Sequence, residues 1–343
     1  MPAKNPYTIF EKAENKRGSS KFLEAIPLYL EAKKLSGHDK ELRGSCYFSL
    51  GDTYRMVGEF TKACKCYIEA YSQVLELGDE ARSLDALVGL GLSLRATGDF
   101  KEALELFNKS LKGYKKLDDK AGAAFTLWAR AGALRIKGDL KGTIAGFKEA
   151  KKMFARQKDR SGEGYCLTGL GGASRVNGSH GDSYKYYKEA NKVFRGLKDT
   201  FGIAYSYCGI ANSLRMKGDF KGSLAFFKKA KTNYKRIGDK VSYAYTLWGE
   251  GTSYQILGKD HLALKDFKEA KKLFTETKDK RGLIYYQLSL GQMEYKKNPK
   301  KGIKTLGEAL KRAEGLSLGV EARYAKEVLK TMEKSGNLPL NLA

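Results

Sequence analysis

The feature that most constrains this chain is a repeat with a period of 40 residues. Aspartate recurs at this spacing at Asp39, Asp79, Asp119, Asp159, Asp199, Asp239 and Asp279. In a second frame the pairs Gly98-Asp99, Gly138-Asp139 and Gly218-Asp219 recur with the same period. A chain that repeats itself at this interval is built from one supersecondary unit that stacks on its neighbours.

Each recurrent aspartate precedes a helical pattern and is predicted to be a helix N-cap. A carboxylate there accepts the free N–H groups of the first turn and meets the positive end of the helix dipole. The glycine of each Gly-Asp pair suits the left-handed position at a helix end, and the aspartate then begins the next helix. One period is therefore helix A, a tight turn, helix B and a longer turn. In the second full repeat we expect helix A at 80–96 and helix B at 100–117.

The packing of these helices can be predicted from residue size. Helix B carries an aromatic residue at Tyr67, Phe107, Phe147, Tyr187, Phe227 and Phe267, each followed three residues later by a small residue. Glycines stand inside helix A at Gly89, Gly91, Gly169, Gly171, Gly249 and Gly251. Each costs about 1 kcal/mol relative to alanine, so we expect close packing of a neighbouring helix B to offset that cost. A phosphate-binding loop is excluded, because these glycines are mid-helix and no Lys-Ser/Thr follows.

The residues of one repeat resemble a known family. Helix A of the first full repeat carries Tyr47, Leu50, Gly51 and Tyr54, and its helix B carries Ala63, Tyr67 and Ala70. This set resembles the tetratricopeptide repeat (TPR) over nearly the whole chain. The period of 40 exceeds the usual 34 and is similar to the longer repeats of Pins/LGN-type adaptors and kinesin light chains. The resemblance implies an all-α fold: an α-solenoid, a right-handed superhelix of about eight antiparallel helix pairs plus a C-terminal capping helix.

We expect one superhelical domain at 1–335 and a loose tail at 336–343. The predicted helix pairs span 5–36, 40–77, 80–117, 120–157, 160–197, 200–237, 240–277 and 280–314. Asn5 and Pro6 are predicted to begin the first pair. The segment 317–335 is richer in charge and is predicted to be a capping helix that solvates the end of the stack.

Several classes of protein are excluded or disfavoured. The sequence has no apolar run of about 18 residues, so no membrane insertion is expected, and residues 1–16 lack the apolar core of a signal peptide. Five cysteines without an even framework favour a reducing, cytoplasmic location. His38, His180 and His261 lie far apart. We therefore expect no catalytic constellation, no metal and no cofactor.

One face of helix A carries the candidate binding residues. Arginine recurs on this face at Arg55, Arg95, Arg135, Arg175 and Arg215. An aromatic residue recurs at Phe125, Tyr165, Tyr205, Tyr245 and Tyr285, and Trp128, Trp248 and Asn212 share the face. Spacing shows only that these residues share a face. The resemblance to the TPR family implies that the face lines a concave groove where extended peptides bind.

These residue types suit an extended, acidic, partly apolar ligand, because arginine pairs with carboxylates and Tyr or Trp offers a large rigid contact area. The candidate anion contacts are Arg135, Arg175 and Arg215, and the candidate apolar walls are Trp128, Tyr165, Tyr205, Tyr245 and Trp248. A structural role is equally open. Four of the arginines precede an acid by four residues, as Arg95 precedes Asp99, and could form ion pairs within the repeat. Arg175 lacks that acid, and the aromatic residues could be core.

Two charged residues, Arg130 and Glu250, occupy a position that is apolar in the other repeats. A buried charge there is costly without a partner. Either the face opens to solvent at these places or the charge has a buried partner.

The net charge of +25 exceeds what solubility requires and would attract acidic partners, although lysines crowding helix B also suit a plain solvated face. Our leading hypothesis is a non-catalytic adaptor that binds an extended acidic segment of another protein in the groove. The alternative is single-stranded RNA or other nucleic acid, because arginine with Tyr and Trp also suits phosphates and stacked bases. A third possibility is a self-assembling scaffold. The oligomeric state stays open.

Overall fold

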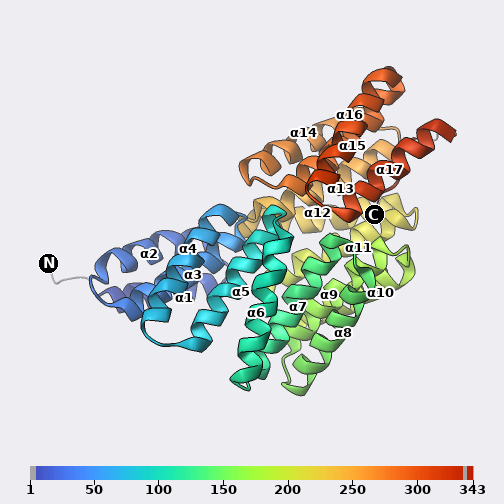
Figure 1. The fold of residues 1–343 in the computed structure, drawn as a ribbon. Coiled ribbons are helices and arrows are strands. Elements are labelled where there is room, and N and C mark those ends of the chain that lie inside the picture. The colour runs from blue at the N-terminus through green and yellow to red at the C-terminus, as the bar shows by residue number, and fades with distance from the viewer. Residues whose placement is uncertain (1–4, 335–337, 343) are drawn as a thin grey trace.

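The computed structural model describes residues 5–334 and 338–342. Over these residues 17 α-helices follow one another, each packed against the next, as Figure 1 shows. The predicted all-α solenoid of helix pairs with a final single helix is confirmed. The ends of the predicted domain at 1 and 335, and residues 336, 337 and 343 of the predicted tail, lie outside the described residues.

The helices form consecutive A and B pairs. The first half comprises α1 (Pro6–Gly18), α2 (Phe22–Leu35), α3 (Lys40–Met56), α4 (Phe60–Glu76), α5 (Glu80–Thr97), α6 (Phe100–Lys116), α7 (Lys120–Lys137) and α8 (Leu140–Arg156). The second half comprises α9 (Arg160–Val176), α10 (His180–Leu197), α11 (Thr200–Met216), α12 (Phe220–Ile237), α13 (Lys240–Ile256), α14 (Asp260–Glu276), α15 (Lys280–Lys297), α16 (Pro299–Gly315) and α17 (Gly319–Lys334). No helix of the described residues combines the length and the apolar character needed to cross a bilayer.

The predicted caps are confirmed. All seven recurrent aspartates accept a backbone N–H of the helix that follows, as Asp39 does from Leu42 at 2.9 Å. Gly98 and Gly138 adopt φ values of +97° and +92°, the left-handed conformation that ends α5 and α7. One aspartate of the Gly-Asp frame differs: the side chain of Asp99 does not cap α6 but accepts a hydrogen bond from Lys280 on the distant α15.

The aromatic residue of each helix B packs against bare backbone, as predicted. A methyl group on Gly89 would overlap the ring of Tyr67 on the preceding helix B, and one on Gly91 would lie 2.7 Å from the ring of Phe107 on its own helix B. The pairs Gly169/Gly171 and Gly249/Gly251 meet the rings of helix B in the same way. The cost of glycine inside these helices is thus offset by close approach of the rings.

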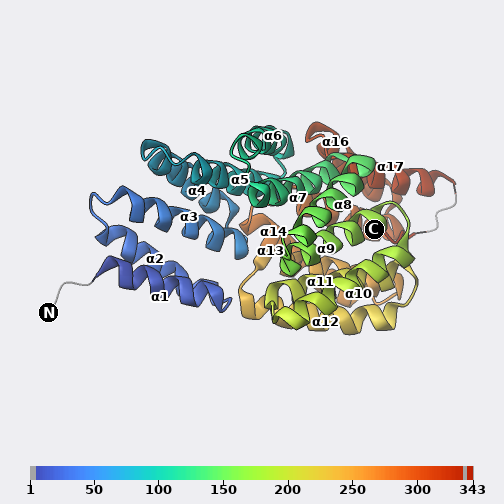
Figure 2. The same ribbon diagram turned by 90° about the horizontal axis from the view of Figure 1, so that it is seen from below.

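The solenoid closes on itself, which the repeat pattern alone did not predict. Lys280 at the start of α15 bonds Asp99 in the α5–α6 turn at 2.8 Å, although 181 residues separate them. Val241 at the start of α13 packs against Gly58 in the α3–α4 turn. In Figure 2 the orange and red helices α13–α17 accordingly lie beside the cyan and green helices α5–α9. The inner face of the A helices is therefore covered by a later part of the same chain.

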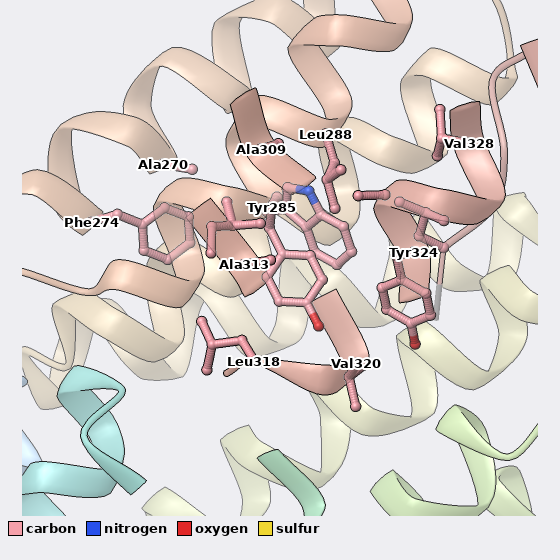
Figure 3. Close-up of a cluster of buried hydrophobic side chains, with 14 of the residues drawn as sticks. Ala270, Phe274, Tyr285, Leu288, Ala309, Ala313, Leu318, Val320, Tyr324 and Val328 are labelled. Atoms are coloured by element: carbon pink, nitrogen blue, oxygen red, sulfur yellow. The ribbon is translucent and has the colours of Figure 1, made fainter. Parts of the chain in front are cut away.

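The final helix α17 does more than solvate the end of the stack, which corrects that part of the prediction. Its residues Val320, Tyr324 and Val328 are buried in the largest hydrophobic cluster, where Figure 3 shows them beside Tyr285 of α15. Arg323 also donates to the main-chain oxygen of Val176 on α9 at 3.1 Å. The charged residues of α17 hid this role, because two of them are themselves used inside: Glu321 is buried and pairs with Arg281, and Arg323 bonds Val176.

The two charged residues at the apolar register differ from each other. Glu250 is buried and bonds Lys231 of α12, so its partner exists. Arg130 is half-buried at the edge of a surface cavity that Glu149 and Asp119 also line, so its face opens to solvent.

The ring-on-glycine contact predicts opposite effects for two glycine-to-alanine changes. Gly89→Ala should lower the free energy of unfolding by about 1–3 kcal/mol, because the added methyl overpacks against Tyr67. Gly307→Ala in α16, where no atom lies within 4 Å of the new methyl, should raise it by about 0.5–1 kcal/mol. Urea unfolding followed by circular dichroism compares the two. A gain in stability from both changes would contradict the packing role.

The buried carboxylate beside Glu250 predicts a pH dependence. Burial, and next the Glu250 charge, raises the pKa of Asp266 to about 7. The folded chain therefore favours the protonated acid, and this stabilisation is present below about pH 4 and lost as the pH rises through about 7. Asp266→Asn should be more stable than the wild type at pH 8 by about 1–2 kcal/mol and equal to it at pH 4. Unfolding of this variant and of the exposed control Glu269→Gln at both pH values checks this, and an equal gain at pH 4 would contradict it.

Candidate binding channel

The inner faces of the A helices line two cavities of about 420 and 260 Å³ that share Arg95, Arg135 and Tyr205. We call the two together the channel. Its lining includes the predicted residues Arg55, Arg95, Arg135, Arg175, Trp128, Tyr165, Tyr205, Asn212, Tyr245, Trp248 and Tyr285. Val241 and Ser242 of α13 line both cavities as well. The structure thus brings these predicted residues to one surface, while their contact with a ligand stays a prediction. Arg215, the third predicted anion contact, is buried and lines neither cavity.

The arginines do not form the ion pairs that the sequence left open. Arg55 pairs with Asp52 at 3.3 Å and not with Glu59. The aspartates four residues after these arginines lie in turns, where Asp99 binds Lys280 and Asp139 and Asp219 cap the next helix. The interpretation of the arginine row as ion pairs within the repeat is therefore wrong.

Three arginines of the channel lack a counter-charge. Within the described part of the chain, no carboxylate oxygen lies within 4.0 Å of Arg95, Arg135 or Arg175. The Nε of Arg175 is buried without a hydrogen-bond partner. Among the described residues, Arg95 bonds the main-chain oxygen of Ala129 at 3.3 Å and lies 5.7 Å from the ring of Trp128. Burial, and then the neighbouring arginines, lower the pKa of Arg95 to about 10, as expected where cations are crowded and partly dehydrated.

Glycine on the inner face makes room for this row. A methyl group on Gly132 would overlap the guanidinium of Arg95, and one on Gly172 would lie 3.6 Å from that of Arg135. Arg95 and Arg135 therefore each lie across the next A helix at a residue without a side chain, whereas Asn212 stands at the same offset from Arg175. The row is formed between repeats, not within them.

The aromatic residues of the channel pack in the stack and also line its wall. The Trp128 indole donates to the main-chain oxygen of Tyr165 at 3.3 Å, and the Tyr165 hydroxyl donates to Asp199 at 2.8 Å. Trp248 is only 5% exposed and its ring lies 4.6 Å from that of Tyr285. Core packing therefore accounts for Trp248 and Tyr285, whereas Trp128, Tyr165 and Tyr205 are half-buried and leave part of their surface facing the channel.

The sequence reasoning missed two features of the inner face. Arg281 of α15 lines the channel and pairs with the fully buried Glu321 of α17 at 2.9 Å. Residues 338–342, which belong to the predicted loose tail, are not loose: they bond Arg215 and Gln292. Neither feature has a periodic signal. The spacing places Gln292 on the same face as the arginines, but nothing in the sequence indicates that it binds Leu340.

The different surroundings of two channel arginines predict different costs of removal. Arg135→Gln should change the free energy of unfolding by no more than about 1 kcal/mol, because no carboxylate loses a partner. Arg281→Gln leaves Glu321 buried and unpaired and should cost about 3–5 kcal/mol. Chemical unfolding of the two variants checks this. An equal cost for Arg135→Gln would assign that residue a structural role.

Comparison with known proteins agrees with the fold. The family model described as tetratricopeptide repeat matches residues 53–116. A search of curated proteins finds no match to the sequence. A solved Rap protein complexed with competence and sporulation factor is 14% identical, covers 96% of this chain and 98% of that one, and has a TM-score of 0.64.

Two further solved structures are similar over most of the chain. The Rap conjugation gene regulator of the plasmid pLS20, in complex with the Phr* peptide, is 16% identical over 98% of this chain and all (100%) of that one, with a TM-score of 0.65. Aspartyl phosphate phosphatase F from Bacillus subtilis is 14% identical over 94% and 86%, with a TM-score of 0.57. At these identities the similarity shows the fold alone, and the likeness to Pins/LGN-type adaptors stays a prediction. The chain is a TPR-like α-solenoid that carries a tetratricopeptide repeat match at residues 53–116.

Proposed function

We propose that the chain is a non-catalytic adaptor that binds an extended, acidic, partly apolar segment of another protein in the channel. The observation that carries this proposal is the row of Arg95, Arg135 and Arg175, which lies in a lined cavity without carboxylate partners among the described residues. Partly buried cations without a counter-charge lose hydration and regain little from the protein. A ligand carboxylate would supply the missing charge-assisted hydrogen bonds.

The wall beside the arginines suits the apolar part of such a segment. Trp128, Tyr165 and Tyr205 contribute ring surface to the same cavity as Arg95 and Arg135. Rigid aromatic surface next to a planar cation is a combination typical of strong contact residues in protein interfaces. Two of the similar solved structures are themselves complexes, one with competence and sporulation factor and one with the Phr* peptide, which supports a binding role for a fold of this kind.

Nucleic acid is the weaker candidate for the channel. Binding of single strands depends on free aromatic faces on which bases stack. Trp248 is almost fully buried against Tyr285, and the ring of Tyr165 lies 4.8 Å from that of Phe194. Because Trp248 and one side of Tyr165 pack against neighbouring rings, fewer ring faces are left for base stacking, and this favours a peptide main chain and carboxylates over bases.

The test uses defined peptides as probes. A fluorescein-labelled peptide of alternating Asp and Leu should bind the full chain, whereas the matching Lys-Leu peptide should not. Arg135→Glu combined with Arg175→Glu should weaken the acidic peptide by at least about a hundredfold, because two charge-assisted contacts become repulsive. Fluorescence anisotropy at fixed salt measures the affinities.

The control has the same change of charge outside the channel. Lys148→Glu with Lys152→Glu lies on the exposed face of α8 and should reduce binding only slightly. Equal losses from the two double variants would show that only net charge matters, and would overturn the channel as the site. Tighter binding of a labelled oligouridine than of the acidic peptide would replace the peptide by nucleic acid.

A further inference from the structure

Residues 338–342 form a short irregular segment that turns at Asn341, where the N–H of Leu342 donates to the carbonyl oxygen of Leu340 at 3.1 Å. The segment is bound at the inner face by the side-chain amide of Asn341. Arg215 donates from Nη1 to the Oδ1 of Asn341, and the Nδ2 of Asn341 donates to the main-chain oxygen of Arg215 at 2.8 Å. Both ends of the amide are therefore recognised by one residue of α11. An aspartate could accept the first bond but could not donate the second.

The main chain of the segment is recognised as well. Arg215 donates from Nη2 to the carbonyl oxygen of Leu342 at 2.8 Å, and the N–H of Leu340 donates to Oε1 of Gln292 at 2.6 Å. Main-chain bonds on both sides of Asn341 hold the segment in a single register. Such bonds are available to the main chain of any peptide that adopts the same turn, so they supply affinity while the amide supplies selectivity.

The leucines of the segment are bound by apolar surface. Leu342 is 4% exposed within the cluster that contains Trp248 and Tyr285, and Leu338 and Leu340 pack against the same cluster. Burying a leucine side chain contributes about 1.5–3 kcal/mol. The segment is thus held by polar contacts at its centre and by apolar contacts along its length.

The residues that hold the segment belong to the predicted inner face. Asn212, Arg215 and Gln292 occupy its equivalent positions on α11 and α15, and Asn212 also lines the channel. Asn212 accepts from Arg215 at 3.1 Å, and the ring of Trp248 lies 5.5 Å from the same guanidinium. Arg215 is the one arginine of the row that is fully buried, and the groups that bury it include a piece of the chain separated from it by 126 residues.

We propose that this end of the channel is a subsite for a Leu-Asn-Leu segment that turns at its asparagine and presents a neutral amide side chain. Residues 338–342 occupy the subsite in the chain itself and compete there with a peptide partner. This proposal rests on the proposed function and adds to it: acidic residues of the partner meet Arg95, Arg135 and Arg175, and an amide meets Arg215. Occupancy by the chain's own segment lowers the apparent affinity for a partner in proportion to the fraction of molecules in which the segment is bound.

The test adds the segment back as a separate peptide. A labelled acetyl-Leu-Pro-Leu-Asn-Leu amide is titrated against the full wild-type chain and the full chain carrying Asn341→Ala and Leu342→Ala. The double variant, which loses the contacts of its own segment, should bind the peptide at least about tenfold more tightly than the wild type. Lys334→Ala, on the exposed end of α17, is the control and should bind as the wild type does.

Selectivity is tested on the same double variant. A peptide with Ala or Asp in place of Asn should bind at least about tenfold more weakly, because Arg215 loses one or both amide bonds. Adding Gln292→Ala should also weaken binding, and since it removes only the contact to Leu340 it avoids a change at the buried Arg215. Thermal melting identifies any variant that fails to fold.

Each outcome separates this proposal from the proposed function. Equal affinity of the wild type and the double variant for the Leu-Pro-Leu-Asn-Leu peptide would overturn competition by the chain's own segment. If the alternating Asp-Leu peptide binds and the Leu-Pro-Leu-Asn-Leu peptide binds neither protein, the subsite fails while the proposed function stands. If only the Leu-Pro-Leu-Asn-Leu peptide binds, and only with Gln292 present, the subsite stands and the acidic ligand fails.

Discussion

The structure depends on one contact that recurs along the chain: in the helices B from α4 to α14, an aromatic ring rests on small residues of the neighbouring A helices. Where these small residues are glycine, as around Tyr67 and Tyr187, no side chain separates the ring from the neighbouring backbone. A ring that packs against backbone on both sides restricts the orientation of each helix pair relative to the next, because close-packed interiors resist even small changes in volume. A nearly constant step between pairs then accumulates into a superhelix.

That accumulated curvature gives the molecule its interior. Contacts between residues 181 apart, such as Lys280 with Asp99, bring the start of a late A helix against an early turn. The inner face that would otherwise face solvent becomes the wall of a channel. On an open solenoid these arginines would be exposed and hydrated. In the channel they are partly dehydrated, so an anionic or amide partner stabilises them.

The arginines of the inner face differ in the hydrogen-bond partners that the chain itself provides. At one end both terminal nitrogens of Arg215 donate to oxygens of Asn341, Leu342 and Asn212, although its Nε is buried without a partner. Farther along, the Nε of Arg175 is also buried without a partner. A partner peptide would therefore gain most where the chain has left its own groups unsatisfied, and would have to displace residues 338–342 where it has not.

Local chemistry controls the parts of this structure that can be predicted from the sequence. The aspartate caps, the left-handed glycines, the helix bounds and the ring-on-glycine packing could all be predicted, because each involves residues within one repeat or its neighbour and recurs with the period. The shared face of Arg135, Arg175 and Tyr205 followed from helical spacing. The sequence does not indicate that Asp99 binds Lys280, that α17 packs inside or that Asn341 binds Arg215. These contacts join residues 126 to 181 apart and occur once each, so no periodic pattern marks them. They depend on the total rotation that accumulates over many helix pairs, which the sequence of a single repeat does not specify.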